Sequence, residues 1–199
     1  MQHNPRVVVV GAGFAGIEVI KTFQQLRTPV SITLVSQKST FEYYPALYKL
    51  VTGALPIEVS VPVRTILPNP AITFVEATYE KIDQDRQVIT VTDSTGRQSE
   101  IVYDYLIVAL GSETNFFNIK GLPELSHSFK SVAAALKLKR HFCELFGKAK
   151  NLTKDELVSM LHVLIVGAGP SGVELAGDLR SYLTKIAIAS GVDPSLVTI

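Results

Sequence analysis

The chain is poor in cysteine, because Cys143 is the only one among its 199 residues. A single cysteine cannot form an internal disulfide, which favours a reducing compartment such as the cytoplasm. It also excludes a redox-active dithiol within the chain. The net charge is small as well, at +1, and so gives no sign of the basic face that nucleic-acid partners select. We therefore expect no nucleic-acid partner, and we predict no metal site.

Long apolar runs are also missing. The first five residues are polar, and the first apolar run covers only residues 7–10, so we expect no secretory leader. No window approaches the ~20 apolar residues of a membrane span. The overall composition, with 47% hydrophobic residues, is that of a globular protein long enough to bury a core.

One pattern occurs twice, as "RVVVVGAGFAGIE" near the start and as "HVLIVGAGPSGVE" later in the chain. Its G-x-G-x-x-G spacing is carried first by Gly11, Gly13 and Gly16, and then by Gly167, Gly169 and Gly172. In such a loop the first glycine permits a tight turn and the second lets a pyrophosphate approach the backbone. The third lets the following helix pack on the preceding strand. Both copies therefore predict a phosphate-binding loop between a strand and a helix.

The two copies match beyond their glycines. A shift of 156 residues superposes residues 7–20 on residues 163–176, and 7 of these 14 positions are identical. A glycine-rich turn without a ligand is a serious alternative for one loop, but much less so for a matched pair. Two loops imply two dinucleotides, and the simplest use of two is to pass a hydride or electrons between a nicotinamide cofactor and a flavin.

The order of apolar runs and turn residues along the rest of the chain predicts an α/β fold. We expect two nested Rossmann-like dinucleotide-binding units, of which the second is truncated, and a small antiparallel β-meander. Buried parallel strands are expected at residues 6–10, 31–35, 72–75 and 105–110, with a further strand from residue 162. Helices are expected at residues 14–26, 45–51, 63–67, 131–147 and 153–161. The meander is expected at residues 77–82, 87–92 and 98–103.

Three motifs carry a family resemblance: "VVVVGAGFAG", "YDYLIVALGSETN" and "VLIVGAGPSGVELAGDL". Together they resemble the two-dinucleotide flavoproteins of the pyridine nucleotide-disulfide oxidoreductase superfamily. The resemblance implies that the first motif binds FAD, that the second returns to the flavin, and that the third binds the nicotinamide dinucleotide. It assigns residues 1–125 to the first part of an FAD-binding domain and residues 126–199 to the start of a nested NAD(P)H-binding domain.

The stretch "STFEYYPALYKLVTGAL" has no cysteine where the disulfide reductases carry a dithiol. It is similar instead to the matching segment of type II NADH dehydrogenases. That resemblance implies FAD, NAD(H) or NADP(H), and a quinone or another small electron acceptor. It also implies peripheral membrane contact, at the inner face of a membrane, through a C-terminal part that lies beyond this chain. Homodimerisation is left open.

The chain resembles the first half of such an enzyme, so we expect it to be inactive by itself. Three alternatives stay open. One is an apoptosis-inducing-factor-like oxidoreductase, and another is a sulfide:quinone- or ferredoxin-reductase-like flavoenzyme. The third is a dinucleotide-binding or sensing module without turnover.

The resemblance also implies roles for individual residues. The FAD pyrophosphate loop is Gly11, Ala12, Gly13, Phe14, Ala15 and Gly16, and the loop that closes on the flavin is Ala109, Leu110, Gly111 and Ser112. The nicotinamide loop is Gly167, Gly169, Pro170, Ser171 and Gly172. Glu174 is the catalytic candidate, expected near the nicotinamide and flavin rings. The alternative is an ordinary first-turn acid that suits the helix dipole, since Glu18 occupies the same place in the first copy.

One element of the pattern is absent. An acid about 20 residues past the loop usually binds the ribose hydroxyls, but no acid occurs from residue 19 to residue 41. Ser36 or Gln37 could bind the ribose instead, and Lys38 would favour a phosphate; alternatively, these residues simply begin a loop. Tyr43, Tyr44 and Tyr48 follow, either lying against a flavin or quinone ring or packing within an interface.

Overall fold

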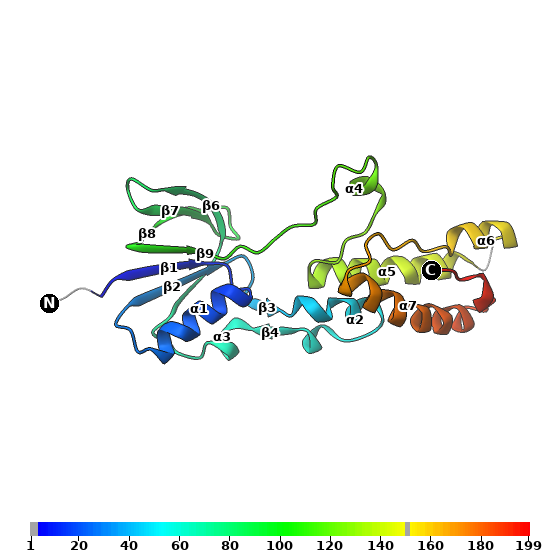
Figure 1. Ribbon diagram of the computed structural model, residues 1–199, viewed down its shortest axis with the longest axis horizontal. Helices are drawn as coiled ribbons and strands as arrows, with labels where there is room; N and C mark the ends of the chain where they lie inside the picture. Colours follow the sequence, from blue (N-terminus) through cyan, green and yellow to red (C-terminus); the bar gives the residue numbers. More distant parts are fainter. Residues whose placement is uncertain (1–3, 150–151) are drawn as a thin grey trace. The chain divides into compact units, whose positions relative to one another are not determined.

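The computed structural model describes residues 4–149 and 152–199, and these form two compact units (Figure 1). Unit 1 contains the described residues up to Glu42 together with Val61–Ser112. Unit 2 contains Tyr43–Ser60 and Glu113–Ile199. Residues 43–60, which lie early in the sequence, therefore pack with the C-terminal part of the chain.

Unit 1 is built on a four-stranded sheet with the order β5-β2-β1-β9, in which every pairing is parallel. Its strands are β1 (Arg6–Val10), β2 (Ser31–Ser36), β5 (Thr73–Glu76) and β9 (Tyr105–Val108). The valines of β1 are fully buried because this strand has a neighbour on each side and cover on both faces. The four parallel strands predicted from the sequence are confirmed.

One of these strands is not buried as predicted. Within the described residues β9 pairs only with β1 and forms an edge of the sheet. The side chain of Tyr105 is accordingly 63% exposed, and Val108 and Leu110 are exposed as well. The apolar sequence predicted a strand with neighbours on both sides, but the sheet supplies one neighbour only.

The two faces of the sheet are covered differently. On one face, Val7 and Val9 pack with α1 (Phe14–Gln25) and α3 (Val63–Ile66), and α1 buries Ile17 and Ile20 there. On the other face, Val8 and Val10 pack with the meander, which contributes Ile89 and Val91. The period of two along β1 thus divides its side chains between two cores.

The meander has the predicted antiparallel order β6-β7-β8. Its strands are β6 (Thr78–Asp83), β7 (Val88–Thr92) and β8 (Gln98–Val102). A separate two-stranded pairing joins β3 (Thr40–Glu42) to β4 (Ser60–Pro62).

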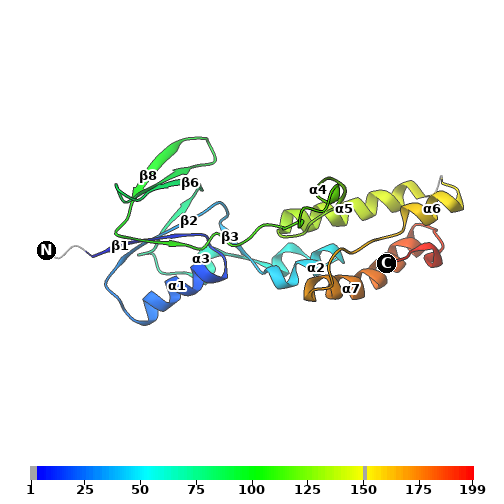
Figure 2. The ribbon, with the colours of Figure 1, turned by 45° about the horizontal axis from the view of Figure 1, so that its top comes forward.

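Unit 2 is helical. Its core lies between α2 (Leu47–Val51), α5 (Val132–Lys148) and α7 (Pro170–Ala189), which lie side by side in Figure 1 and Figure 2. Shorter helical segments are η1 (Tyr44–Ala46), η2 (Pro56–Glu58), α4 (Leu122–Leu125), α6 (Lys154–Met160) and η4 (Pro194–Leu196). Thr153 and Glu156 form a capping box at the start of α6. In the part of the chain that the structure describes, no helix is long and apolar enough to cross a membrane.

The strand predicted from residue 162 does not form as a strand. Its only described pairing is an isolated parallel bridge between His162 and Thr198, and residues 163–166 are not in a ladder. Leu164 is 77% exposed, so the segment is not buried either. A strand is held by hydrogen bonds to a neighbour along its length, whereas here the backbone bonds to Thr198 involve only Leu161 and Val163.

Candidate functional site

The first glycine loop lies between β1 and α1 in unit 1. Gly11 has φ +108°, a conformation that residues with a β-carbon rarely adopt. Gly13 is the extended N-cap of α1, and its carbonyl accepts the backbone N–H of Ile17 at 3.0 Å. A β-carbon on Gly16 would overlap the carbonyl of Gly11 and reach Val9 Cγ1 at 3.4 Å. The three glycines therefore meet the three requirements that the sequence pattern implies.

Two neighbouring strands hold this loop in place. The backbone N–H of Gly11 donates to the carbonyl of Val35, at the end of β2, at 2.8 Å. On the other side, the N–H of Ala109 donates to the carbonyl of Val10 at 2.7 Å. A β-carbon on Gly11 would also overlap the Ala109 carbonyl. The predicted loop at residues 11–16 and the start of the predicted flavin-closing segment, residues 109–112, thus meet at the carboxyl ends of adjacent parallel strands.

The rest of that segment is exposed. Leu110, Gly111 and Ser112 leave the sheet edge at the end of β9. Gly111 turns the chain with φ +82°, again a conformation suited to glycine.

Polar side chains gather where β2 ends, and we call this group, Ser36, Gln37, Lys38 and Glu42, the polar corner. Ser36 Oγ accepts the backbone N–H of Lys38 at 3.3 Å, and Lys38 Nζ donates to Glu42 Oε1 at 2.7 Å. Gln37 is exposed between them. The sequence pattern pointed to Ser36, Gln37 and Lys38, but it missed Glu42. The only signal available was its spacing of four residues from Lys38.

An aromatic contact joins this corner to the glycine loop. The rings of Phe14, the first residue of α1, and Phe41, on β3, meet edge to face with centroids 4.9 Å apart. Phe41 was not a predicted site residue. Its contact places β3, and with it Glu42, beside the start of α1.

The second glycine loop lies before α7 in unit 2 and repeats the first in backbone shape. Gly167 has φ +112° and Gly169 is the extended N-cap, whose carbonyl accepts the N–H of Val173 at 3.1 Å. A β-carbon on Gly172 would overlap the carbonyl of Gly167 and reach Ile165 Cγ2 at 3.5 Å. The likeness holds although residues 163–166 form no strand.

Both loops leave room for a ligand. A β-carbon built on Gly13 or on Gly169 would meet no described atom within 4 Å. The space beside each helix N-terminus is therefore open, and the free N–H groups of a first helical turn attract anions. The residues present fit a dinucleotide pyrophosphate at each loop.

Glu174, the catalytic candidate, is exposed on α7. It lies beyond the first turn, in which α7 has no acid, and Glu18 has the same position on α1. The alternative of a first-turn acid suited to the helix dipole is therefore wrong for both residues. The catalytic role of Glu174 stays a prediction.

The three tyrosines lie in unit 2. Tyr43 and Tyr44 are exposed before α2, whereas Tyr48 is half-buried against the core of that unit. The position of Tyr48 is therefore explained by packing within the protein. The exposed pair stays a candidate for ring contacts.

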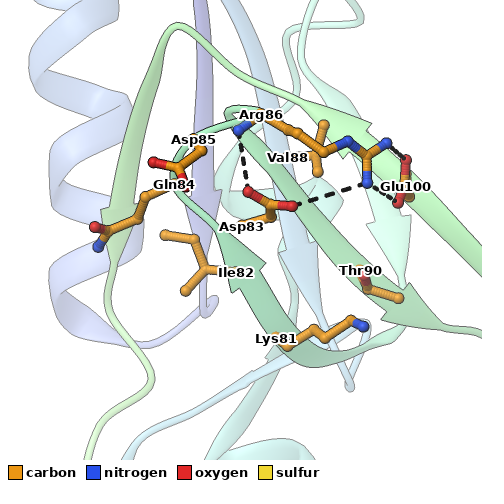
Figure 3. A pocket seen from close by; sticks show the side chains of 9 residues that line it. All are labelled: Lys81, Ile82, Asp83, Gln84, Asp85, Arg86, Val88, Thr90 and Glu100. Atoms are coloured by element: carbon orange, nitrogen blue, oxygen red, sulfur yellow. Dashed lines mark hydrogen bonds and ion pairs between the residues drawn. The ribbon is translucent and has the colours of Figure 1, made fainter.

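A hollow of about 500 Å³ lies elsewhere, on the meander of unit 1 (Figure 3). Arg86 binds Glu100 there through two hydrogen bonds of 3.0 and 2.7 Å, with Asp83 beside it. Hydrogen bonds from Arg86 lower the pKa of Glu100. Three of the charged side chains of this hollow, Asp83, Arg86 and Glu100, thus interact with one another, and neither glycine loop contributes to its lining. Among the described residues, no three metal-binding side chains gather into a group.

Comparison with known proteins agrees with the geometry. The model of the family described as pyridine nucleotide-disulphide oxidoreductase matches residues 5–195. The type II NADH:quinone oxidoreductase of Staphylococcus aureus (strain COL) is 31% identical, covering 100% of this chain and 48% of the relative. The demethylphylloquinone reductase NdbB of Synechocystis is 33% identical over 90% of this chain and 44% of the relative.

A third relative is the mitochondrial external alternative NAD(P)H-ubiquinone oxidoreductase B3 of Arabidopsis thaliana, 30% identical over 90% of this chain and 33% of the relative. The chain therefore spans about a third to a half of the length of these curated relatives.

Solved structures show the same fold. NDH2 from Plasmodium falciparum in complex with NADH superposes with a TM-score of 0.88 at 24% identity, over 98% of this chain and 41% of that one. The sulfide:quinone oxidoreductase from Aquifex aeolicus has a TM-score of 0.71 at 28% identity, over 94% of this chain and 42% of that one. The paired glycine loops, the parallel sheet and the match over residues 5–195 together establish that this chain belongs to the pyridine nucleotide-disulphide oxidoreductase family.

Proposed function

We propose that this chain supplies the dinucleotide-binding segments of an FAD-dependent oxidoreductase that takes a hydride from NADH or NADPH and passes electrons to a quinone. The observation that carries the proposal is the pair of loops with one backbone shape, at Gly11–Gly16 and at Gly167–Gly172. Two of the curated relatives are an NAD(P)H-ubiquinone oxidoreductase and an NADH:quinone oxidoreductase, and this supports the choice of electron donor and acceptor.

Each loop has its own task in this proposal. Residues 11–16 hold the FAD pyrophosphate through backbone N–H groups, and residues 109–112 close on the flavin. Residues 167 and 169–172 hold the nicotinamide dinucleotide. When bound, the flavin supplies the two-electron chemistry, and the protein contributes orientation and exclusion of water.

Glu174 would act at the nicotinamide. Glu174 lies on α7 two residues after Gly172, the end of the second loop, and is exposed, so its carboxylate could accept a hydrogen bond from the carboxamide or hold a proton. If so, Glu174→Gln should weaken hydride transfer while leaving binding at the glycine loop unchanged.

The proposal also covers the domains to which the residues belong and the place where the enzyme works. Residues 1–125 form the first part of an FAD-binding domain and residues 126–199 the start of an NAD(P)H-binding domain. The enzyme would work in the cytoplasm at a membrane surface, where a quinone is reached. Because the chain spans at most about half of its curated relatives, we expect it to bind dinucleotides by itself but not to turn over.

The test separates the two loops. FAD and NADH are titrated against the purified chain and against Gly16→Ala and Gly172→Ala, in which a new methyl group meets a backbone carbonyl. Gly177→Ala is the matched control, because a methyl group there meets no described atom within 4 Å. Gly16→Ala should abolish FAD binding alone, Gly172→Ala should abolish NADH binding alone, and the control should bind both. A chain that binds neither dinucleotide contradicts the proposal.

A second function is favoured by the same coverage of the relatives: a dinucleotide-binding module without turnover. The two are separated by one absorbance experiment on the flavin-loaded protein. Bleaching of the flavin band by NADH under anaerobic conditions supports the oxidoreductase, and subsequent recovery of the band with a short-chain quinone supports the acceptor. A flavin band that stays unchanged supports the binding module.

A further inference from the structure

Two residues, Arg6 and Asp104, join the start of β1 to the start of β9, and we call this pair the clamp. Asp104 Oδ2 accepts the backbone N–H of Arg6 at 2.7 Å and its side-chain Nε–H at 3.1 Å, and Oδ1 accepts the guanidinium Nη2 at 2.7 Å. In return, the backbone N–H of Asp104 donates to the carbonyl of Arg6 at 2.9 Å. Side chain and backbone together thus join two residues that lie 98 positions apart in the sequence.

The clamp fixes the register of a strand that has few other constraints. Within the described residues β9 pairs only with β1, and only its two middle residues, Leu106 and Ile107, are partly buried. Buried side chains normally specify the register of a strand, and a strand that buries little is prone to slip. The ladder itself adds little to this choice, because every residue offers the same N–H and C=O groups. The two-point contact between guanidinium and carboxylate joins one particular pair of residues, and so it favours one register.

That register decides what lies beside the first glycine loop. The pairing of β1 with β9 runs in step along both strands, up to the N–H of Ala109, which donates to the carbonyl of Val10 at 2.7 Å. The Ala109 carbonyl then lies so close to Gly11 that a β-carbon on Gly11 would overlap it. A slip by one residue would bring a different carbonyl to this contact and would displace residues 109–112 relative to the loop.

We propose that the clamp sets the position of residues 109–112 against the flavin of a dinucleotide bound at the first loop. Arg6 and Asp104 are positioning residues, because they lie at the amino ends of β1 and β9, whereas the loop lies at the carboxyl ends. The inference rests on the proposed function, since it assumes that the first loop binds FAD. It assigns to an ion pair remote from the loop a part in binding the flavin.

The test compares FAD with ADP, which contains the pyrophosphate of FAD but lacks the flavin. Both are titrated by calorimetry against the whole chain carrying Gly172→Ala, so that the second loop does not contribute. We expect this parent to bind FAD more tightly than ADP, because residues 109–112 add contacts to the flavin alone. The ratio of the two dissociation constants measures that contribution. Equal affinities would overturn the proposal, since the segment would then contribute nothing for the clamp to position.

Variants of the clamp locate the effect. Asp104→Ala removes the carboxylate and its hydrogen bonds, and it should weaken FAD about fivefold while changing ADP less than about twofold. Arg6→Met keeps the backbone N–H that Asp104 accepts, so its effect should be smaller and in the same direction. Arg6→Lys keeps the charge and should recover part of the lost ratio. FAD and ADP weakened alike in Arg6→Met would show a merely structural role and would overturn the proposal.

The double variant Arg6→Met/Asp104→Ala tests whether the two residues act as a unit. Its ratio of FAD to ADP affinity should match that of Asp104→Ala, because the guanidinium acts only through the carboxylate. A further loss in the double variant would mean that Arg6 acts by another route and would contradict the clamp. Where Asp104→Ala loses ADP binding as well, Arg6→Met and Arg6→Lys carry the test.

Glu100→Gln is the matched control. It breaks another surface pair of arginine and carboxylate in the same unit, on the meander and away from both loops, so the ratio should stay that of the parent. A second readout is quenching of flavin fluorescence by iodide, which increases when a flavin is more open to water. Quenching should increase in Asp104→Ala and stay unchanged in Glu100→Gln. Equal quenching in these two variants would overturn the proposal.

Failure of the proposed function looks different. If neither ADP nor FAD binds to the parent, and FAD does not bind to the unaltered chain, the first loop is no dinucleotide site and both proposals fall. If both ligands bind but neither their ratio nor the quenching responds to Arg6 and Asp104, only the inference about the clamp falls.

Discussion

The carbonyl oxygen of Gly11 fills the space that a β-carbon on Gly16 would need, so helix α1 can begin against the loop only because residue 16 has no side chain. The same relationship holds between Gly167 and Gly172 in the other unit. The third glycine of each loop is thus required by packing between helix and loop, before any ligand is considered.

Replacing Gly16 should therefore lower the stability of the chain itself. A methyl group at a fully occupied position forces backbone shifts, so Gly16→Ala should lower the free energy of unfolding by about 1–3 kcal/mol. Gly177→Ala, in the open on α7, should instead raise it by about 0.5–1 kcal/mol, the usual gain at a helical glycine. Urea unfolding followed by circular dichroism measures both, and equal effects would mean that the Gly11 carbonyl is not the cause.

The ion pair on the meander should show in the acid limb of the stability curve. Hydrogen bonds from Arg86 lower the pKa of Glu100 below its ordinary value of 4.5 in the folded chain. The pair therefore stabilises the fold above pH 4.5, and its contribution is lost as the pH falls through the lowered pKa. Urea midpoints of the unaltered chain and of Glu100→Gln should differ at neutral pH and converge in acid.

The control for that experiment is Glu80→Gln. Glu80 is exposed on β6 of the same meander and has no ion pair with any residue the structure describes. Its replacement removes a carboxylate from the same meander without breaking an ion pair of the described residues, so it should lower the stability at neutral pH less than Glu100→Gln does. If the two variants behave alike, the Arg86 contact contributes nothing measurable in solution.

A second pH effect is expected at the alkaline end. Burial, with the charge and hydrogen bond of Cys143, raises the pKa of Tyr182 from 10.0 to about 12. The folded chain then binds the phenolic proton more tightly than the unfolded chain does. The stability from this group is fully present below pH 10 and is lost as the pH rises towards 12.

Ultraviolet titration of tyrosine ionisation measures this shift directly. Tyr182→Phe should remove an ionisation near pH 12, and Cys143→Ala should lower the pKa of Tyr182 only part of the way towards 10.0, because burial is the larger cause. If the ionisation that Tyr182→Phe removes has its midpoint near pH 10 instead of near pH 12, the assignment is contradicted.

The N-terminus of α5 offers a test confined to unit 2. Ser131 Oγ accepts the backbone N–H of Ala134 at 3.1 Å and so satisfies one unpaired donor of the first turn. Ser131→Ala should lower the free energy of unfolding by about 1 kcal/mol, and Ser131→Asp should largely preserve it. Thermal unfolding of the three proteins measures the difference, and an equal loss in both variants would exclude capping as its origin.

Patterns carried by neighbouring residues predicted much of the structure. The valine run of β1 and the glycine spacing were sufficient for the buried strand and for both loops, because those features depend on nearby backbone. The predicted helix starts at residues 131 and 153 also lie within one residue of those observed, and there Ser131 and Thr153 each accept a backbone N–H three residues away.

Features that depend on distant partners were missed. An apolar run such as residues 105–110 shows a tendency to form a strand, but it does not show how many neighbours the sheet provides. The same reason explains why residues 163–166 form no strand. The ion pair between Lys38 and Glu42 depends on the turn between β2 and β3, and the four-residue spacing of the two residues is the only sign of it in the sequence.

The second loop keeps its shape without a sheet beneath it, and this has a consequence for how such proteins are assembled. Its conformation is set within one short contiguous stretch of chain, from Gly167 to Val173. A loop whose contacts lie so close together in the sequence has little loop-closure entropy to overcome when it forms.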